Sequence, residues 1–142
     1  DTDERLIAAL TENARLPVST LADRLGIART TVQARIERLE RRGVIKGYTV
    51  RLSPQAREGE IRATVLVRIR PRATPELLAR MKTMAEVEVV HTTAGQFDLV
   101  VVARASSPAK LDAALDRIGD LDGVNSIESL IHLSTRIDRA AL

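Results

Sequence analysis

The chain contains, at residues 29–48, the stretch RTTVQARIERLERRGVIKGY. Val32, Ile36 and Leu39 recur in it at the spacing of one helical face, and Gly43 follows as a residue suited to ending a helix. The stretch therefore predicts a helix over residues 29–42 with one buried stripe. The β-branched residues that come next predict a short linking strand that ends near residue 52.

Two shorter helices are predicted before this one. Apolar residues at helical spacing mark the first over residues 3–14 and the second after Pro17, with Ser19 or Thr20 as its N-cap. A turn of three or four residues that contains Gly26 joins the second helix to the third. Two helices joined by so short a turn, the second of them basic, are typical of a helix-turn-helix.

Basic charge is concentrated in the first part of the chain. Residues 1–58 hold 11 Lys and Arg against 8 Asp and Glu, whereas residues 59–142 hold 11 against 11. Within residues 29–51 seven basic residues stand against only Glu37 and Glu40. Such a basic segment is the electrostatic footprint expected for a phosphate backbone, and a solvated helix face is the alternative that composition leaves open.

The composition of the 142-residue chain excludes several classes of site. Without cysteine there is no disulfide, thiolate nucleophile or iron–sulfur cluster, and His91 and His132 alone make a poor metal site. No side chain is placed as a nucleophile beside a general base, so we expect neither a catalytic residue nor a cofactor, and no enzyme. Tyr48 and Phe97 are the only aromatic residues, which disfavours base stacking on single strands and favours reading of double-stranded DNA.

No apolar run approaches the roughly 18 residues of a membrane span, and the polar start at residues 1–4 does not resemble a signal peptide. We therefore expect no membrane contact and a cytoplasmic location.

The sequence pattern of residues 61–142 predicts strands and helices, in contrast to the helical pattern of the first part of the chain. Ile61, Ala63, Val65, Val67 and Ile69 alternate with more polar residues, which predicts a half-buried strand. The elements predicted after it are a helix opened by Thr74 as N-cap, strands over 87–93, 97–103 and 124–133, and a helix opened by residues 106–108. This order, βαββαβ, is that of a ferredoxin-like module.

The predicted fold class is α+β, with an N-terminal helix-turn-helix (winged) DNA-binding domain over residues 1–52, a linker over 53–60 and the βαββαβ domain over 61–142. The helices of such a module cover only one face of its sheet. The other face would expose apolar side chains unless a second copy covers it, which predicts a homodimer.

Several motifs carry a resemblance to a known family. The runs are DERLIAAL at residues 3–10, TVQARIERL at 31–39, GVIKGY at 43–48 and GQFDL at 95–99. Across nearly the whole chain they resemble the Lrp/AsnC family of feast/famine transcription regulators. The resemblance implies a DNA reader followed by an effector-sensing domain. It also implies homodimers that assemble further into tetramers or octamers, and small effectors, often amino acids, bound between subunits near the sheet hairpin.

The candidate DNA-binding residues lie on or near the third helix. In the major groove Arg29 and Gln33 are placed to reach base edges, because arginine suits guanine and glutamine suits adenine. The candidates for phosphate contact are Ser19, Thr30, Thr31, Arg35 and Arg38.

The candidate effector-binding residues follow the second signature of the family and the last strand: Thr93, Gly95, Gln96, Phe97, Asp98, Ser126 and Ser129. Backbone N–H groups of a glycine turn suit a carboxylate and Asp98 suits an ammonium, which together match an amino acid. A hairpin turn made by Gly95 and capped by Asp98 is the equally simple structural alternative.

Two positions depart from the family pattern. Ala28 stands where the family often has a serine opening the third helix, and Ser126 and Ile127 stand near its usual arginine–threonine pair. Two other functions stay open at this point: a metabolite-binding regulatory module that acts through protein partners, and a small enzyme.

Overall fold

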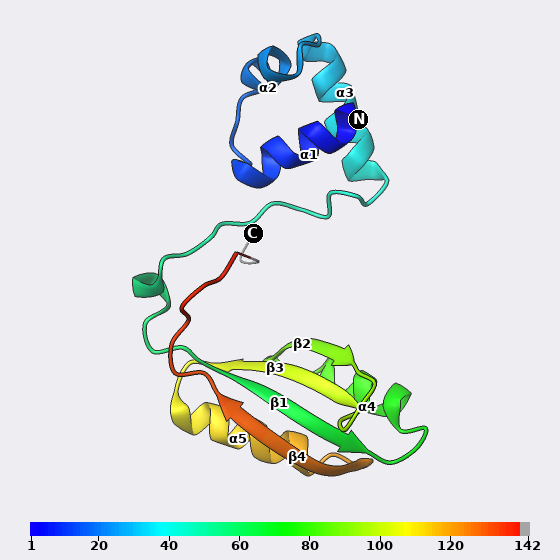
Figure 1. Cartoon of the computed structure of the whole chain (residues 1–142), viewed down its shortest axis with the longest axis vertical. Coiled ribbons are helices and arrows are strands. Elements are labelled where there is room, and N and C mark those ends of the chain that lie inside the picture. The colour runs from blue at the N-terminus through cyan, green and yellow to red at the C-terminus, as the bar shows by residue number, and fades with distance from the viewer. Residues whose placement is uncertain (140–142) are drawn as a thin grey trace. The chain divides into compact units, whose positions relative to one another are not determined.

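The computed structural model describes residues 1–139. These residues form two compact units, the first built from Asp1–Leu52 and the second from Ser53–Ile137. The first unit is helical and the second is a sheet covered by helices (Figure 1). The α+β fold class predicted from the sequence is confirmed.

Helices α1 (Thr2–Glu12), α2 (Val18–Leu25) and α3 (Arg29–Arg41) make up the first unit. Each contributes leucine or valine side chains to one core, whose fully or almost fully buried members are Leu6, Leu10, Leu21, Ala22, Leu25, Val32 and Leu39. The predicted stripe on α3 is thus buried at its two ends, and Ile36 packs against the same core while half-buried.

Two local predictions in this unit are wrong. Helix α2 begins at Val18 with Pro17 as its N-cap and no side-chain hydrogen bond, so neither Ser19 nor Thr20 caps it. The strand predicted within residues 44–52 does not form, since these residues pair with no other strand in the described chain. A strand is stabilised by ladder hydrogen bonds, and β-branched residues cannot supply the partner that such a ladder needs.

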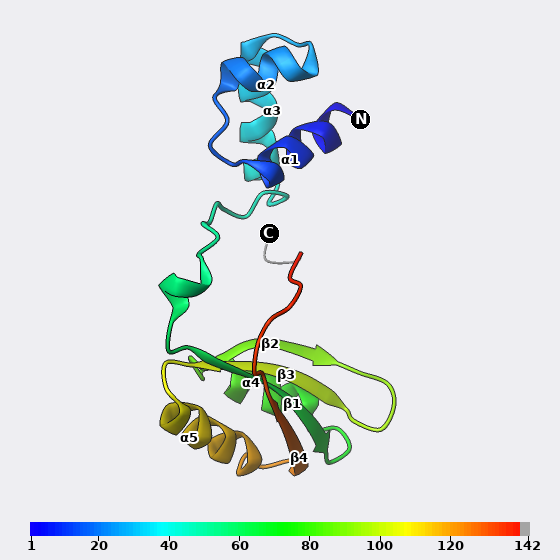
Figure 2. The ribbon, with the colours of Figure 1, turned by 60° about the vertical axis from the view of Figure 1, so that its left-hand side comes forward.

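The second unit begins with a 3-10 turn, η1 (Pro54–Arg57), within the predicted linker. Strands β1 (Ile61–Ile69), β2 (Val87–Thr92), β3 (Leu99–Ala105) and β4 (Val124–Ile131) then alternate with helices α4 (Thr74–Met81) and α5 (Pro108–Gly119). The sheet is antiparallel in the order β2-β3-β1-β4, so β1 and β3 are central (Figure 2). This is the predicted βαββαβ order.

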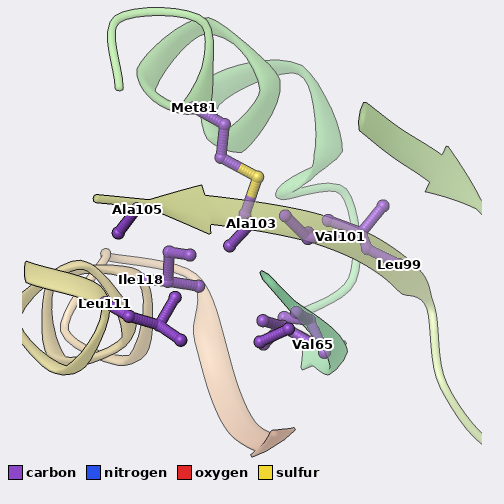
Figure 3. Close-up of a cluster of buried hydrophobic side chains, with 10 residues drawn as sticks. Val65, Met81, Leu99, Val101, Ala103, Ala105, Leu111 and Ile118 are labelled. Atoms are coloured by element: carbon purple, nitrogen blue, oxygen red, sulfur yellow. The ribbon is translucent and has the colours of Figure 1, made fainter. Parts of the chain in front are cut away.

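Both helices cover the same face of the sheet. Val65 and Val101 lie opposite each other on the two central strands and are fully inaccessible to solvent, together with Met81 from α4 and Ile118 from α5 (Figure 3). The alternation predicted for β1 is therefore real, because its inward residues meet this helical layer. Among the described residues no polar or charged side chain is buried in either core.

Some element ends differ from the sequence prediction. Thr74 is the first residue of α4 rather than its N-cap, which is Ala73. Strand β3 begins at Leu99, two residues later than expected, because Asp98 belongs to the turn that precedes it. No helix in the described range is long and apolar enough to cross a membrane.

The face of the sheet opposite the helices is the open face. Strand alternation places five apolar side chains on it: Leu66, Val89, Val100, Val102 and Leu130. Leu130 keeps 49% and Val89 37% of its surface exposed, and the other three are half-buried. The open face also carries charged groups, since Arg104 pairs with both Glu60 and Glu88 at its edge.

Candidate nucleic-acid interface and effector turn

Helices α2 and α3 are joined by the tight turn that a helix-turn-helix requires. Gly26 ends α2 in the left-handed conformation, at φ 70°, and its N–H donates to the carbonyl of Ala22 at 2.8 Å. Any side chain is disfavoured at that φ, which explains glycine at this position. The turn lets Leu25 and Val32 share one core, so the side of α3 opposite Val32, Ile36 and Leu39 faces away from the unit.

Helix α3 begins at Arg29 with Ala28 as its N-cap and no side-chain cap. Arg29, Thr30 and Thr31 in its first turn are all exposed. A first turn without a capping side chain leaves amide N–H groups for water or an anion to satisfy. The start of α3 therefore combines exposed polar side chains with backbone donors.

Gln33 is exposed on the next turn of α3, and its side chain already has a partner. Its Nε2 donates to Oε1 of Glu37 at 3.2 Å, from one turn of the helix to the next. Glu37 is not among the residues predicted to contact DNA, although its i and i+4 spacing from Gln33 is the sequence signal for this pair.

Arg35 and Arg38 are both bound by one carboxylate of α1. The Arg35 Nη1 donates to Asp3 Oδ1 at 2.8 Å and the Arg38 Nη2 donates to Asp3 Oδ2 at 2.9 Å. The hydrogen bond from Arg35, helped by the bond and charge of Arg38, holds the pKa of Asp3 below its usual range although partial burial opposes the shift. The two predicted phosphate contacts are therefore neutralised in part by a residue more than thirty positions away.

The remaining candidate, Ser19, is half-buried in the first turn of α2. The structure thus places all seven candidate DNA-binding residues on the two helices of the helix-turn-helix, with five exposed and Ser19 and Arg35 half-buried.

The candidate effector residues at 93–98 form a hydrogen-bonded turn between β2 and β3. Thr93 donates from its N–H to the carbonyl of Asp98 at 2.9 Å and from its hydroxyl to the carbonyl of Phe97 at 2.8 Å. Gly95 has a φ of 141°, within the range that favours glycine. The turn is therefore held in shape by its own polar groups.

Asp98 and Arg68 attach this turn to β1. Oδ2 of Asp98 accepts the N–H of Ile69 at 2.9 Å, where the register between β1 and β4 shifts. Arg68 donates from Nε to the carbonyl of Gln96 at 3.1 Å and stacks over the ring of Phe97 at 5.0 Å from its centroid. Arg68 is not among the predicted effector residues, because it lies almost thirty residues before the turn it holds and no local pattern in the sequence points to it.

The two serines of β4 lie on opposite faces of the sheet. Ser126 is opposite Arg68, on the open face, and Ser129 is opposite Val65, on the face that the helices cover. The structure therefore brings Ser126 to the end of the sheet where Arg68 holds the turn and does not bring Ser129 there.

A separate hollow of about 560 Å³ lies between the C-terminal ends of α4 and α5. Arg117 donates to Glu86 across it at 2.5 Å. The pKa of Glu86 is lowered by its own backbone N–H first and by Arg117 second. Arg117 and Glu86 therefore satisfy each other, and Arg80 and Asp120 are the other charged residues that line the hollow.

Residues 1–139 contain no group of three or more side chains suited to holding a metal ion. His91 is exposed on the edge strand β2, and His132 lies 2.8 Å from the hydroxyl of Thr64.

Two family models match the chain. A winged helix-turn-helix DNA-binding model covers residues 1–46, and a model described as the Lrp/AsnC ligand binding domain covers residues 62–142.

Curated relatives extend over almost the full length of the chain. The HTH-type transcriptional regulator LysM of Saccharolobus solfataricus is 33% identical over 95% of this chain and 94% of its own length. The HTH-type transcriptional regulator LrpA of Mycobacterium tuberculosis is 33% identical over 92% of this chain and 88% of its own.

Solved structures share the fold. AsnC of E. coli matches 98% of this chain and 95% of its own with a TM-score of 0.86 at 25% identity. A complex of the transcriptional regulator NMB0573 of Neisseria meningitidis with L-Met matches 100% of this chain and 94% of its own, with a TM-score of 0.86 at 24% identity.

Proposed function

The chain belongs to the Lrp/AsnC family of DNA-binding transcription regulators, and from that premise we propose that it reads a specific duplex sequence with α3 and responds to an amino acid as a homo-oligomer. The observation that carries the proposal is the exposed, basic α3 on a helix-turn-helix joined in one chain to a ligand-binding domain.

In this proposal α3 enters the major groove. Arg29 and Gln33 reach base edges from the first two turns, and Ser19, Thr30 and Thr31 contact phosphates. Arg35 and Arg38 supply further phosphate contacts through guanidinium N–H groups that Asp3 does not use, apart from the buried Nε of Arg35.

The open face of the sheet supports a homodimer. Its five apolar side chains lie beside charged residues on the neighbouring positions, as at a specific interface rather than a solvated surface. A two-fold axis through this face would pair two copies of α3, so the bound site would be a pseudo-palindrome with half-sites about one turn apart or a multiple of that. Assembly to a tetramer or octamer would repeat that arrangement.

The proposed effector site is the turn at Thr93–Asp98 with Ser126. Backbone N–H groups beside Gly95 would bind the carboxylate of an amino acid, and the Asp98 oxygen that does not accept from Ile69 would bind its ammonium. Support comes from the Neisseria neighbour in complex with L-Met, which shares the fold. Ser129 is not included, because it faces the helices.

Duplex binding is tested first, by selecting bound sites from a random DNA library and titrating salt. We expect an enriched pseudo-palindrome and an affinity that falls steeply as salt rises. Absence of duplex binding even at low salt would refute the DNA-reading proposal and favour action through a protein partner.

The effector is tested by thermal shift with each common amino acid on the wild type and on Asp98→Asn. The amide still accepts the Ile69 N–H, so the turn is kept while the charge that binds an ammonium is lost. Asp112→Asn on exposed α5 is the matched control. Equal stabilisation of all three proteins would remove Asp98 from the site.

A further inference from the structure

Glu37 places a carboxylate on the side of α3 that faces away from the core. At roughly 100° per residue, Glu37 lies about 140° round the helix from Val32 and about 160° from Leu39. Those two residues are 0% and 4% exposed, whereas Glu37 is exposed. This position shares the outward side of the helix with Ala34 and Arg41.

Within residues 1–139 no ion pair neutralises this carboxylate. Although Arg41 lies one turn further along α3, no ion pair joins it to Glu37 in the described part of the chain. The partner of Glu37 is instead the neutral amide of Gln33, which donates to Oε1 at 3.2 Å, and the Glu37 residue is exposed. The carboxylate is therefore both charged and held in direction.

A carboxylate on the surface that approaches DNA is unfavourable unless it finds a donor. It accepts hydrogen bonds only, and the phosphates and the guanine edge in the major groove are themselves acceptors. The exocyclic amino groups of cytosine and adenine are the donors in that groove, and a carboxylate pairs with cytosine N4. Placed beside guanine or thymine, Glu37 would lose its water without gaining a partner.

We propose that Glu37 is a specificity-determining residue that accepts a hydrogen bond from cytosine N4 at one position of each half-site, with Gln33 fixing its carboxylate. The inference rests on the proposed entry of α3 into the major groove. It revises the predicted role of Gln33, because its amide nitrogen donates a hydrogen bond to Glu37 and is therefore not reserved for adenine.

The test compares the sites that full-length wild type, Glu37→Ala, Glu37→Gln and Glu40→Ala select from one random duplex library. Wild-type sites should carry cytosine at one half-site position, with about tenfold weaker binding when it is replaced. Glu37→Ala should lose that preference alone. Glu37→Gln should move it toward adenine, which a glutamine side chain recognises.

Glu40→Ala is the matched control because it removes the same charge from the same exposed helix. The Glu40 carboxylate lies near Tyr48, whose pKa it raises in addition to the larger effect of partial burial. Both alanine variants should bind random duplex more tightly, and only Glu37→Ala should change the selected sequence.

An unchanged base preference in Glu37→Ala would overturn the proposal for Glu37 and leave DNA reading by α3 intact. If the wild type enriched no sequence at all, both proposals would be refuted: sequence-specific DNA binding by α3 and the contact of Glu37 with cytosine. A preference lost equally in Glu40→Ala would show a general charge effect and also refute the specific contact.

Discussion

Asp3 pairs with two of the arginines of α3, and we predict that it limits their contact with a DNA backbone. Its two carboxylate oxygens bind Arg35 and Arg38 at 2.8 and 2.9 Å, so three charged groups present a net charge of one. Asp3→Asn keeps the shape of the side chain and removes its charge. We therefore expect the variant to bind duplex DNA more tightly and with a stronger dependence on salt.

The size of the effect follows from the charge that Asp3 removes, because the net charge of the three groups rises from one to two in Asp3→Asn. Each added phosphate contact steepens the fall of log K with log salt by about 0.9, so the slope should increase by about 0.9. Raising salt from about 50 to about 200 mM should then cost the variant roughly three- to fourfold more affinity than it costs the wild type.

The assay is fluorescence anisotropy on one labelled duplex at several salt concentrations. Asp23→Asn is the matched control, because Asp23 is an exposed acid of α2 with no ion pair within residues 1–139. If Asp3→Asn and Asp23→Asn change the slope equally, release of the two arginines is refuted. A shallower slope in Asp3→Asn would mean that Asp3 holds Arg35 and Arg38 in position for phosphates.

The lowered pKa of Asp3 adds a pH dependence. A carboxyl whose pKa is lower in the folded than in the unfolded chain stabilises the fold above its unfolded value, which is close to 3.8, and that stabilisation disappears as the pH falls through the folded value. The stability that the wild type has over Asp3→Asn in urea denaturation should therefore shrink below pH 3.8. A difference that stays constant well below pH 3.8 would contradict the ion-pair account.

Three further predictions concern the second unit. Gly123→Ala puts a Cβ 2.9 Å from the Cβ of Ala73 at φ 98°, whereas the control Gly59→Ala, at the similar φ of 90°, meets only an ordinary contact. Urea denaturation should therefore show that Gly123→Ala is less stable than Gly59→Ala by about 1–3 kcal/mol. Equal losses of stability in the two variants would refute the packing argument. Val102→Asp on the open face should turn the proposed homodimer into a monomer in sedimentation, and a dimer mass unchanged by the substitution would show that the two copies pair through another surface. Ser107→Ala removes the side-chain acceptor for the first turn of α5 and should lower the free energy of unfolding by about 1 kcal/mol, with recovery in Ser107→Asp as the check.

Burial patterns explain why most of the fold could be predicted from the sequence. The alternation of apolar and polar residues predicted for β1 is found in the structure because Ala63, Val65 and Val67 all face the helices, and each is fully buried. The apolar stripe of α3 could be predicted for the same reason, since Val32 and Leu39 pack in one core with residues of α1 and α2. In both cases the local pattern and the tertiary contact agree.

The linking strand within residues 44–52 could not be predicted in the same way. Val44, Val50 and Leu52 have the composition of a strand, but each stays more than half exposed. Strand propensity reports how well a side chain fits a pleated, half-buried surface, and the described chain offers this segment no such surface. Composition therefore identified an extended segment and not its pairing.

The candidate site shows the corresponding limit for charges. Asp3 reads from the sequence as an acid in a first helical turn, where the helix dipole favours it, and nothing local points to Arg35 or Arg38. Arg68 likewise reads as the outward residue of an alternating strand, although it holds the carbonyl of Gln96. Partners separated by about thirty residues become visible only once the chain is folded.

The charge that α3 presents to DNA is therefore set by its acids rather than by its count of arginines. Asp3, from a different helix, reduces the effective charge along one side, where Arg35 and Arg38 lie. Glu37 lies on the outward side, where no ion pair offsets it in the described residues. Backbone attraction depends on net charge and is the same for every sequence, whereas an unpaired acceptor penalises every base that cannot donate to it. An acid placed in this way lowers affinity for DNA in general more than it lowers affinity for its own site, and so it increases selectivity.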